Sequence, residues 1–167
     1  SCTVIEKKLW FIFGGKDDTG QECFNDIAIF DTAERSWSKP VATGSVPEPR
    51  LYHAAVLVGE NIFIHGGVGK NGVCNDSHVL NTRTLVWTTL KPTGIAAPQR
   101  FGHRLEVRDD PLATSIDSIS IFMVGGCGRP NQSSSNLPQF KLELVPTGKT
   151  SVSTSESATG SKDGATA

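Results

Sequence analysis

Short apolar runs that end at a pair of glycines are the clearest pattern in this chain. The runs cover residues 9–13, 62–65 and 119–124, and they are rich in aromatic and β-branched side chains. Runs of this length that stop at glycine are typical of buried β-strands. No segment combines helical periodicity with the residues that begin and end a helix. The pattern therefore predicts an all-β protein.

The same unit returns along the chain at an offset of 50 residues. The matched pairs are Asn25-Asp26 with Asn75-Asp76, Trp37 with Trp87, Thr43-Gly44 with Thr93-Gly94, Arg50 with Arg100, and His53 with His103. The glycine doublets Gly14-Gly15, Gly66-Gly67 and Gly125-Gly126 belong to the same unit. Their spacing varies only through two local length changes, which indicates loop insertions between fixed strands.

A complete unit contains four predicted strands, and only the blade from His53 to about Leu90 is complete. Three strands of another blade are predicted between residues 9 and 40, and two strands of a third are followed by a weak one near Phe140 to Val145. Besides the strand that ends at the glycines, one follows the Asn-Asp pair, one surrounds the tryptophan, and one follows the histidine. Four short strands in about 50 residues are one blade of a β-propeller. We predict repeat units at about 9–52, 53–102 and 103–145. Because a closed propeller needs at least about four blades, residues 1–146 should form an incomplete one, with two to three four-stranded antiparallel blades.

These residues resemble the kelch repeat. The matching order is an apolar strand with Gly-Gly, an Asn-Asp pair with a second strand, a tryptophan, Thr-Gly, proline, arginine and histidine. The variant at 43–53 is similar to the kelch repeats of host cell factor and the Rab9 effector. The resemblance covers about residues 9–145 and implies a kelch-type β-propeller that serves as a protein-interaction scaffold.

The residues that recur in each unit are expected to be structural. Glycine permits a positive φ and a close approach of backbone, so the three doublets fit crowded strand ends. Trp37 and Trp87 should pack between blades, and the equivalence of His53 and His103 also favours structural roles. Arg50 and Arg100 leave two alternatives open: hydrogen bonds to carbonyls of a neighbouring blade, or a cationic contact for an acidic peptide. The repeats are less like those of the BTB-kelch adaptors, in which arginines near this point hold acidic peptides; that more distant resemblance implies the second alternative.

Loops that differ between units are the expected recognition surface, because the strands are used for the core. The predicted loop face comprises residues 16–22, 42–48, 68–73, 92–99 and 127–137. The candidate binding residues are Lys16, Asp17, Asp18, Glu48, Arg50, Lys70, Asn71, Gln99, Arg100 and Arg129. No metal site and no cofactor are expected, since the four cysteines form no C-x-x-C pair.

Composition narrows the class of partner. With 16 Lys+Arg against 17 Asp+Glu, the chain has no basic block for nucleic acid, and no apolar run approaches the ~18 residues of a membrane helix.

Four cysteines without disulfide spacing suggest reduced thiols in the cytoplasm or the nucleus. Residues 147–167 are mostly Ser, Thr, Gly and Ala and predict a disordered tail. The first residue, Ser1, suggests a piece of a longer protein.

The function hypothesis is a non-catalytic module that binds another protein through the loop face, with self-association through open blade edges as a further expectation. The alternative is a fragment of a kelch-propeller enzyme or specifier protein. A galactose-oxidase-like site needs a tyrosine, and Tyr52 falls where a strand is expected. A nitrile-specifier-like iron site would use Glu22 and Asp26, but Phe30 occupies the third ligand position. A fragment without independent function is the third hypothesis.

Overall fold

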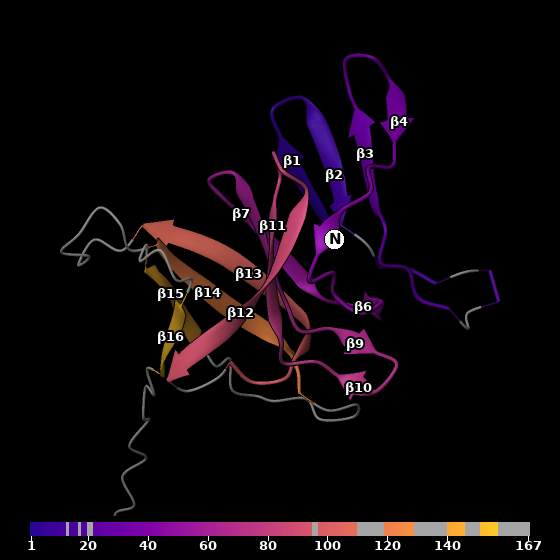
Figure 1. Cartoon of the computed structure of the whole chain (residues 1–167). Coiled ribbons are helices and arrows are strands. Elements are labelled where there is room, and N and C mark those ends of the chain that lie inside the picture. The colour runs from indigo at the N-terminus through magenta and orange to yellow at the C-terminus, as the bar shows by residue number, and fades with distance from the viewer. Residues whose placement is uncertain are drawn as a thin grey trace, which may run out of the picture.

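The computed structural model describes residues 1–12, 14–16, 18–19, 22–94, 97–109, 119–128, 140–145 and 151–156. Within these ranges every regular element is a β-strand. Strand pairing forms three groups of four strands. In Figure 1 they follow one another from β1–β4 at the upper right to β13–β16 at the left. We call these groups blades 1, 2 and 3. The predicted all-β architecture of antiparallel four-stranded blades is confirmed.

Each blade is a meander of four neighbouring antiparallel strands. Blade 1 contains β1 (Cys2–Ile5), β2 (Lys8–Ile12), β3 (Ile27–Asp31) and β4 (Ser36–Ser38). Blade 2 contains β7 (Ala54–Val58), β8 (Asn61–His65), β11 (Ser77–Asn81) and β12 (Val86–Gly94). Blade 3 contains β13 (Phe101–Asp109), β14 (Ile119–Cys127), β15 (Phe140–Val145) and β16 (Ser151–Glu156). Four two-residue strands lie between them: β5 (Thr43–Gly44), β6 (Arg50–Leu51), β9 (Val68–Gly69) and β10 (Gly72–Val73).

The two outer blades each hold one strand more than the sequence pattern predicts. Strand β1 precedes the predicted start of the first unit at residue 9 and pairs antiparallel with β2. Strand β16 lies inside the predicted disordered tail, where it pairs with β15 and also, in parallel, with β12. The tail prediction is therefore wrong for 151–156, because backbone pairing needs no apolar side chain. The rest of 147–167 lies outside the described residues.

The repeated Thr-Gly motif joins each blade to the next. Thr43 and Gly44 pair in parallel with Val86 and Trp87 of β12, and Ser45 N donates to Trp87 O at 2.9 Å. Gly44 has a φ of 83°, and a Cβ there would collide with the Trp87 carbonyl, so only glycine fits. The second Thr-Gly, at the end of β12, pairs with Ser153 and Thr154 of β16 in the same register.

A first apolar core lies between blades 1 and 2. Blade 1 contributes Trp10, Ile27 and Ile29, and blade 2 contributes Ile62, Ile64, Leu80 and Trp87. Trp87 is 1% exposed. The strand register pairs Trp10 with Ile29 and Phe63 with Val79, so Trp10 takes the place of Phe63.

A second core lies between blades 2 and 3 and includes Phe63, Leu90, Leu105, Ile121 and Met123. Both sides of blade 2 are therefore covered, whereas blade 1 is covered on one side. Trp37 lies on the uncovered side and is 61% exposed. The prediction that Trp37 is a core residue is wrong, because the face on which it lies has no blade against it within the described residues.

Candidate binding site

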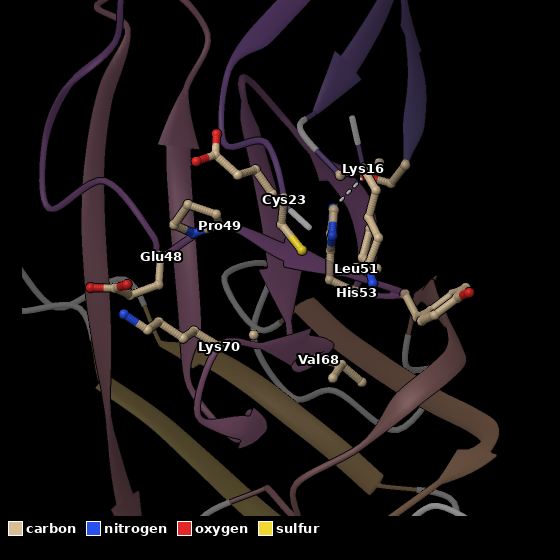
Figure 2. A pocket seen from close by; sticks show the side chains of 14 residues that line it. Lys16, Cys23, Glu48, Pro49, Leu51, His53, Val68 and Lys70 are labelled. Carbon is tan, nitrogen blue, oxygen red and sulfur yellow. Dashed lines mark hydrogen bonds between the residues drawn. The ribbon is translucent and has the colours of Figure 1, made fainter. Parts of the chain in front are cut away.

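An open pocket of about 1390 Å³ lies where the loops of blades 1 and 2 meet. We call it the loop pocket; Figure 2 shows its lining side chains. Its lining residues are Ser1, Gly14, Gly15, Lys16, Glu22, Cys23, Glu48, Pro49, Leu51, Tyr52, His53, Val68, Gly69 and Lys70. They come from the loop after β2, the connection between the blades, and the β9–β10 hairpin. Three of the predicted recognition loops therefore contribute to one concave site.

Short backbone pairings bring these loops together. Leu51 and Val68 pair in the β6–β9 ladder, and an isolated bridge joins Lys16 to Cys23. Gly67 has a φ of 99°, and a Cβ there would lie 2.7 Å from the Leu51 carbonyl. The second glycine of this doublet thus permits the close approach that holds the hairpin against β6.

His53 lies in the pocket wall and is only 8% exposed. Its Nε2 lies 2.8 Å from the hydroxyl of Ser1. Burial, together with the N-terminal amine, Arg50 and His103, lowers the pKa of His53 to about 3. A histidine with this pKa is neutral at pH 7 and is a weak base, so it is poorly suited to general acid–base catalysis but well suited to hydrogen bonding.

The rim of the pocket carries charges of both signs. Lys16, Glu22, Glu48 and Lys70 are all exposed. Figure 2 shows Glu48 and Lys70 on one side of the pocket and Lys16 on the other. The two lysines lie apart, and the rim also carries two glutamates, so the pocket does not form a single strong anion site. It instead offers positive and negative side chains that can pair with opposite charges on a polypeptide segment.

Tyr52 is a lining residue that the sequence analysis did not select. It is 64% exposed and has a φ of 56°, so it occupies a turn between β6 and β7 and not the strand that was expected. Gly102 has the equivalent place one repeat later and a φ of 65°. The glycine at this equivalent position is the sequence feature that could have predicted the turn at Tyr52. An exposed ring at a pocket mouth is a common contact residue in protein interfaces.

Arg50 does not reach the surface, so the expectation that it contacts a partner is wrong. It is 1% exposed. Its guanidinium binds Asp76 through both Nη atoms, with Nη2 to Oδ2 at 2.8 Å, and it donates to the carbonyls of Gly66 and Glu48 at 3.1 Å. The arginine therefore fastens the inter-blade connection to blade 2.

The charge of Asp76 is stabilised by the same contacts. Burial alone would raise its pKa, but hydrogen bonds from Arg50 and His78 hold the pKa well below its ordinary value. His78 Nε2 lies 2.8 Å from Asp76 Oδ2. Asp76 of the second Asn-Asp pair thus provides the counter-ion for Arg50.

Arg100 is also buried, at 7% exposure, and its expected role in partner binding is likewise wrong. Its Nη1 donates to the carbonyls of Gly125 and Gly126 at 2.7 and 3.2 Å. Both glycines have positive φ values, of 73° and 76°. The hydrogen-bonding alternative for the two arginines is the one that the structure supports.

The other predicted binding residues divide into two groups. Lys16, Glu48 and Lys70 line the loop pocket, whereas Asp18, Asn71 and Gln99 are exposed but do not line it. Gln99 Nε2 donates to the Gly128 carbonyl at 3.4 Å. Asp17 and Arg129 lie outside the described residues.

The described residues show neither a metal-binding cluster nor a membrane-spanning helix. No group of three or more His, Cys, Asp and Glu side chains there is placed to hold a metal ion. The same part of the chain contains no helix whose length and apolar character would allow a membrane crossing. The four cysteines are free thiols.

Comparison with known proteins identifies the family. A family profile described as "KLHDC2/KLHL20/DRC7 Kelch-repeats domain" matches residues 1–143. The chain belongs to the kelch-repeat family. The predicted incomplete kelch-type β-propeller is confirmed by this match together with the four-stranded blades, and the family supports a general role in protein interaction.

Several curated kelch relatives are similar over part of their length. Kelch domain-containing protein 2 of Bos taurus is 38% identical over 104 residues, which are 62% of this chain and 24% of that protein. Kelch domain-containing protein 1 of Mus musculus is 31% identical over 153 residues, which are 78% of this chain and 36% of that protein. The Acyl-CoA-binding domain-containing protein 4 of Arabidopsis thaliana is 37% identical over 90 residues, 54% of this chain and 13% of that protein. The chain thus spans about a third or less of these relatives.

Proposed function

We propose that this kelch chain is a non-catalytic interaction module that binds an exposed segment of a partner protein in the loop pocket. The partner is a protein rather than a nucleic acid or a membrane, since the chain has nearly balanced charge. No cofactor is part of this function. Free cysteines without disulfide spacing support action in the cytoplasm or the nucleus.

The observation that carries the proposal is the distribution of repeated and variable residues in the pocket. Residues that recur between units, such as Gly14 and His53, line it. Residues that differ between units, such as Lys16, Tyr52 and Lys70, stand at its exposed rim. A constant scaffold that carries variable side chains around a concave site is the arrangement expected of a recognition surface.

A selection from a displayed random-peptide library tests the proposal. Binders would be measured by fluorescence anisotropy against the parent chain, Tyr52→Gly and Lys70→Ala. Tyr52→Gly removes the ring without backbone strain, since Gly102 adopts nearly the same φ. We expect each variant to weaken the selected peptides by about tenfold, equivalent to about 1.4 kcal/mol.

The matched control is Lys7→Ala, which removes an exposed lysine in the β1–β2 turn, away from the pocket lining. It should leave affinity unchanged. If selected peptides bind all three variants as tightly as the parent, the loop pocket is not the binding site and the proposal fails. A library that yields no binder above background would also contradict it.

A further inference from the structure

A chain of hydrogen bonds leads from Asp76 to two backbone carbonyls beside the loop pocket. Asp76 accepts from both Nη atoms of Arg50, with Nη2 to Oδ2 at 2.8 Å. The same guanidinium donates from Nε to the carbonyl of Glu48 and from Nη1 to the carbonyl of Gly66, each at 3.1 Å. Asp76 and Arg50 do not line the pocket themselves. Their influence on a bound segment therefore has to pass through the backbone that they hold.

The two carbonyls lie next to two different walls of the pocket. The first wall is the connection between blades 1 and 2, which lines the pocket with residues 48–49 and 51–53. The second wall is the start of the β9–β10 hairpin, which lines the pocket with residues 68–70. Arg50 belongs to the first segment and pairs with Gly69 of the second in the β6–β9 ladder. Its buried guanidinium is thus bonded beside both walls, and its position affects how they are spaced.

Asp76 fixes the orientation of this guanidinium. The donors of an arginine lie in one rigid plane, so a carboxylate that accepts two of them sets the plane of the whole group. Asp76 is held in turn by His78, whose Nε2 lies 2.8 Å from Oδ2. The Nδ1 of His78 lies 3.3 Å from the hydroxyl of Thr89 on β12. Since His78 is 6% exposed, the network that orients Arg50 is anchored inside blade 2.

The second junction holds the corresponding carbonyl by another route. The offset of 50 residues places Pro98 where Glu48 lies. The Pro98 carbonyl lies 3.1 Å from Nε2 of His65, and Nδ1 of His65 lies 2.8 Å from the hydroxyl of Ser77. A buried side chain therefore fixes this carbonyl in both junctions. In the first junction that side chain is Arg50, which depends on a charge pair and whose neighbours in the chain line the pocket.

We propose that Asp76 is a positioning residue for the loop pocket. It aims Arg50 at the carbonyls of Glu48 and Gly66, and it thereby sets the spacing of the two walls that receive a partner's segment. His78 supports Asp76 in this role. The proposal rests on the proposed function, because it concerns the same pocket. It adds two residues that the partner does not touch and on which affinity nevertheless depends.

The test uses the peptides selected against the parent chain. Asp76→Asn keeps the size of the side chain but cannot accept two N–H groups from Arg50, and we expect it to weaken these peptides by about fivefold. Arg50→Lys keeps a cation beside Asp76, but a single ammonium cannot hold the carboxylate and both carbonyls in one plane. It should weaken the peptides as much. Fluorescence anisotropy measures the affinities, and circular dichroism at the assay temperature establishes that each variant is folded.

His78→Gln is the milder variant, since it leaves the pair of Asp76 and Arg50 in place. It should weaken the same peptides by about twofold, and it carries the test if Asp76→Asn does not fold. The matched control is Asp31→Asn, which changes a carboxylate of the β3–β4 turn that accepts from the backbone of Ala33 and Glu34, away from the pocket lining. It should leave affinity unchanged. Folded variants at Asp76 and His78 that bind as tightly as the parent would overturn the proposal.

A double-mutant cycle separates positioning from a merely structural role. Tyr52→Gly is expected to weaken the peptides about tenfold in the parent chain, but only about twofold in Asp76→Asn, because the wall that carries Tyr52 has already lost its position. Lys16→Ala is the internal control, since Lys16 comes from the loop after β2 and should have the same effect in both backgrounds. An equal loss from Tyr52→Gly in both backgrounds refutes the role of Asp76 and leaves the proposed function standing. Peptides that ignore Tyr52→Gly and Lys70→Ala in the parent refute the proposed function itself.

Discussion

The two junctions between blades use the same repeated residues with different partners. At the first junction Arg50 binds the carboxylate of Asp76 with both Nη atoms, and His53 lies 2.8 Å from a serine hydroxyl. At the second, Arg100 donates to two backbone carbonyls. Both ring nitrogens of His103 are buried without a hydrogen-bond partner among the described residues. An identical motif therefore does not mean identical energetics.

The cause lies in the residues opposite the motif. The third unit has no Asn-Asp pair, so the carboxylate that binds Arg50 is not repeated in the motif. Strand register places Ala54 where Ser1 lies in blade 1, since Val4 pairs with Leu9 as Leu57 pairs with Ile62. Because Ala54 has no hydroxyl, His103 has no hydrogen-bond partner at the position where Ser1 serves His53. It instead meets the ring of His65 edge-on, with centroids 5.6 Å apart.

Removal of the arginines should show the largest difference between the junctions. Arg50→Met keeps most of the apolar stem but leaves Asp76 unpaired, and we expect a loss of about 3 kcal/mol in the free energy of unfolding. This is the lower end for such pairs because Asp76 is 38% exposed and regains water. Arg100→Met removes hydrogen bonds to two backbone carbonyls and should cost about 1–2 kcal/mol. Urea denaturation of both variants measures the difference, and equal losses would contradict it.

Acid should act on the histidines of both junctions. Burial lowers the pKa of His53 and of His103 from 6.5 to about 3, with His65 and Arg100 adding to the effect at His103. The unfolded chain therefore binds protons first as pH falls. The contribution of each neutral histidine to the free energy of unfolding is complete above about pH 6.5 and is lost as the pH falls toward about 3. At pH 5 the loss is about 2 kcal/mol for each histidine.

The two histidines should differ when they are replaced. His103→Leu removes a titrating group without breaking a hydrogen bond, so it should reduce the acid loss and cost little at pH 7. His53→Leu should reduce the acid loss equally but also lose the contact with Ser1 at neutral pH. Thermal unfolding of both variants between pH 4 and pH 8 provides the measurement. A pH profile identical to the parent in His103→Leu would show that His103 is not buried in neutral form.

The smallest effect should come from supplying the missing hydroxyl. Ala54→Ser places an oxygen near His103 in the way that Ser1 places one near His53, and a hydrogen bond formed there is worth about 1 kcal/mol. Ala55→Ser is the matched control, because its side chain points to the other side of β7, where Ile62 and Ile64 lie. We expect Ala54→Ser to be at least as stable as the parent in urea and Ala55→Ser to be less stable. The reverse order would refute the register argument.

Much of the fold followed from local patterns. The strand around Trp37 and a weak strand near 140–145 were predicted, and they correspond to β4 and β15, because short apolar and aromatic stretches are local signals. The loop face was anticipated in part: Lys16, Glu48 and Lys70 line the pocket. Tyr52 was missed because its neighbours predict a strand. The only sequence signal for its left-handed conformation is the glycine at the equivalent position 102.

The sequence by itself determined the 50-residue repeat, the four strands of the middle blade and the glycine positions, because these depend on backbone conformation and on side chains a few residues apart. Only the tertiary structure decided which copies of a repeated residue are buried, paired or exposed. Trp37 and Trp87 are the same residue in the same motif, yet one is open and the other enclosed. Burial depends on what packs against a surface, and that partner lies far away in the sequence or outside the stretch that carries the motif.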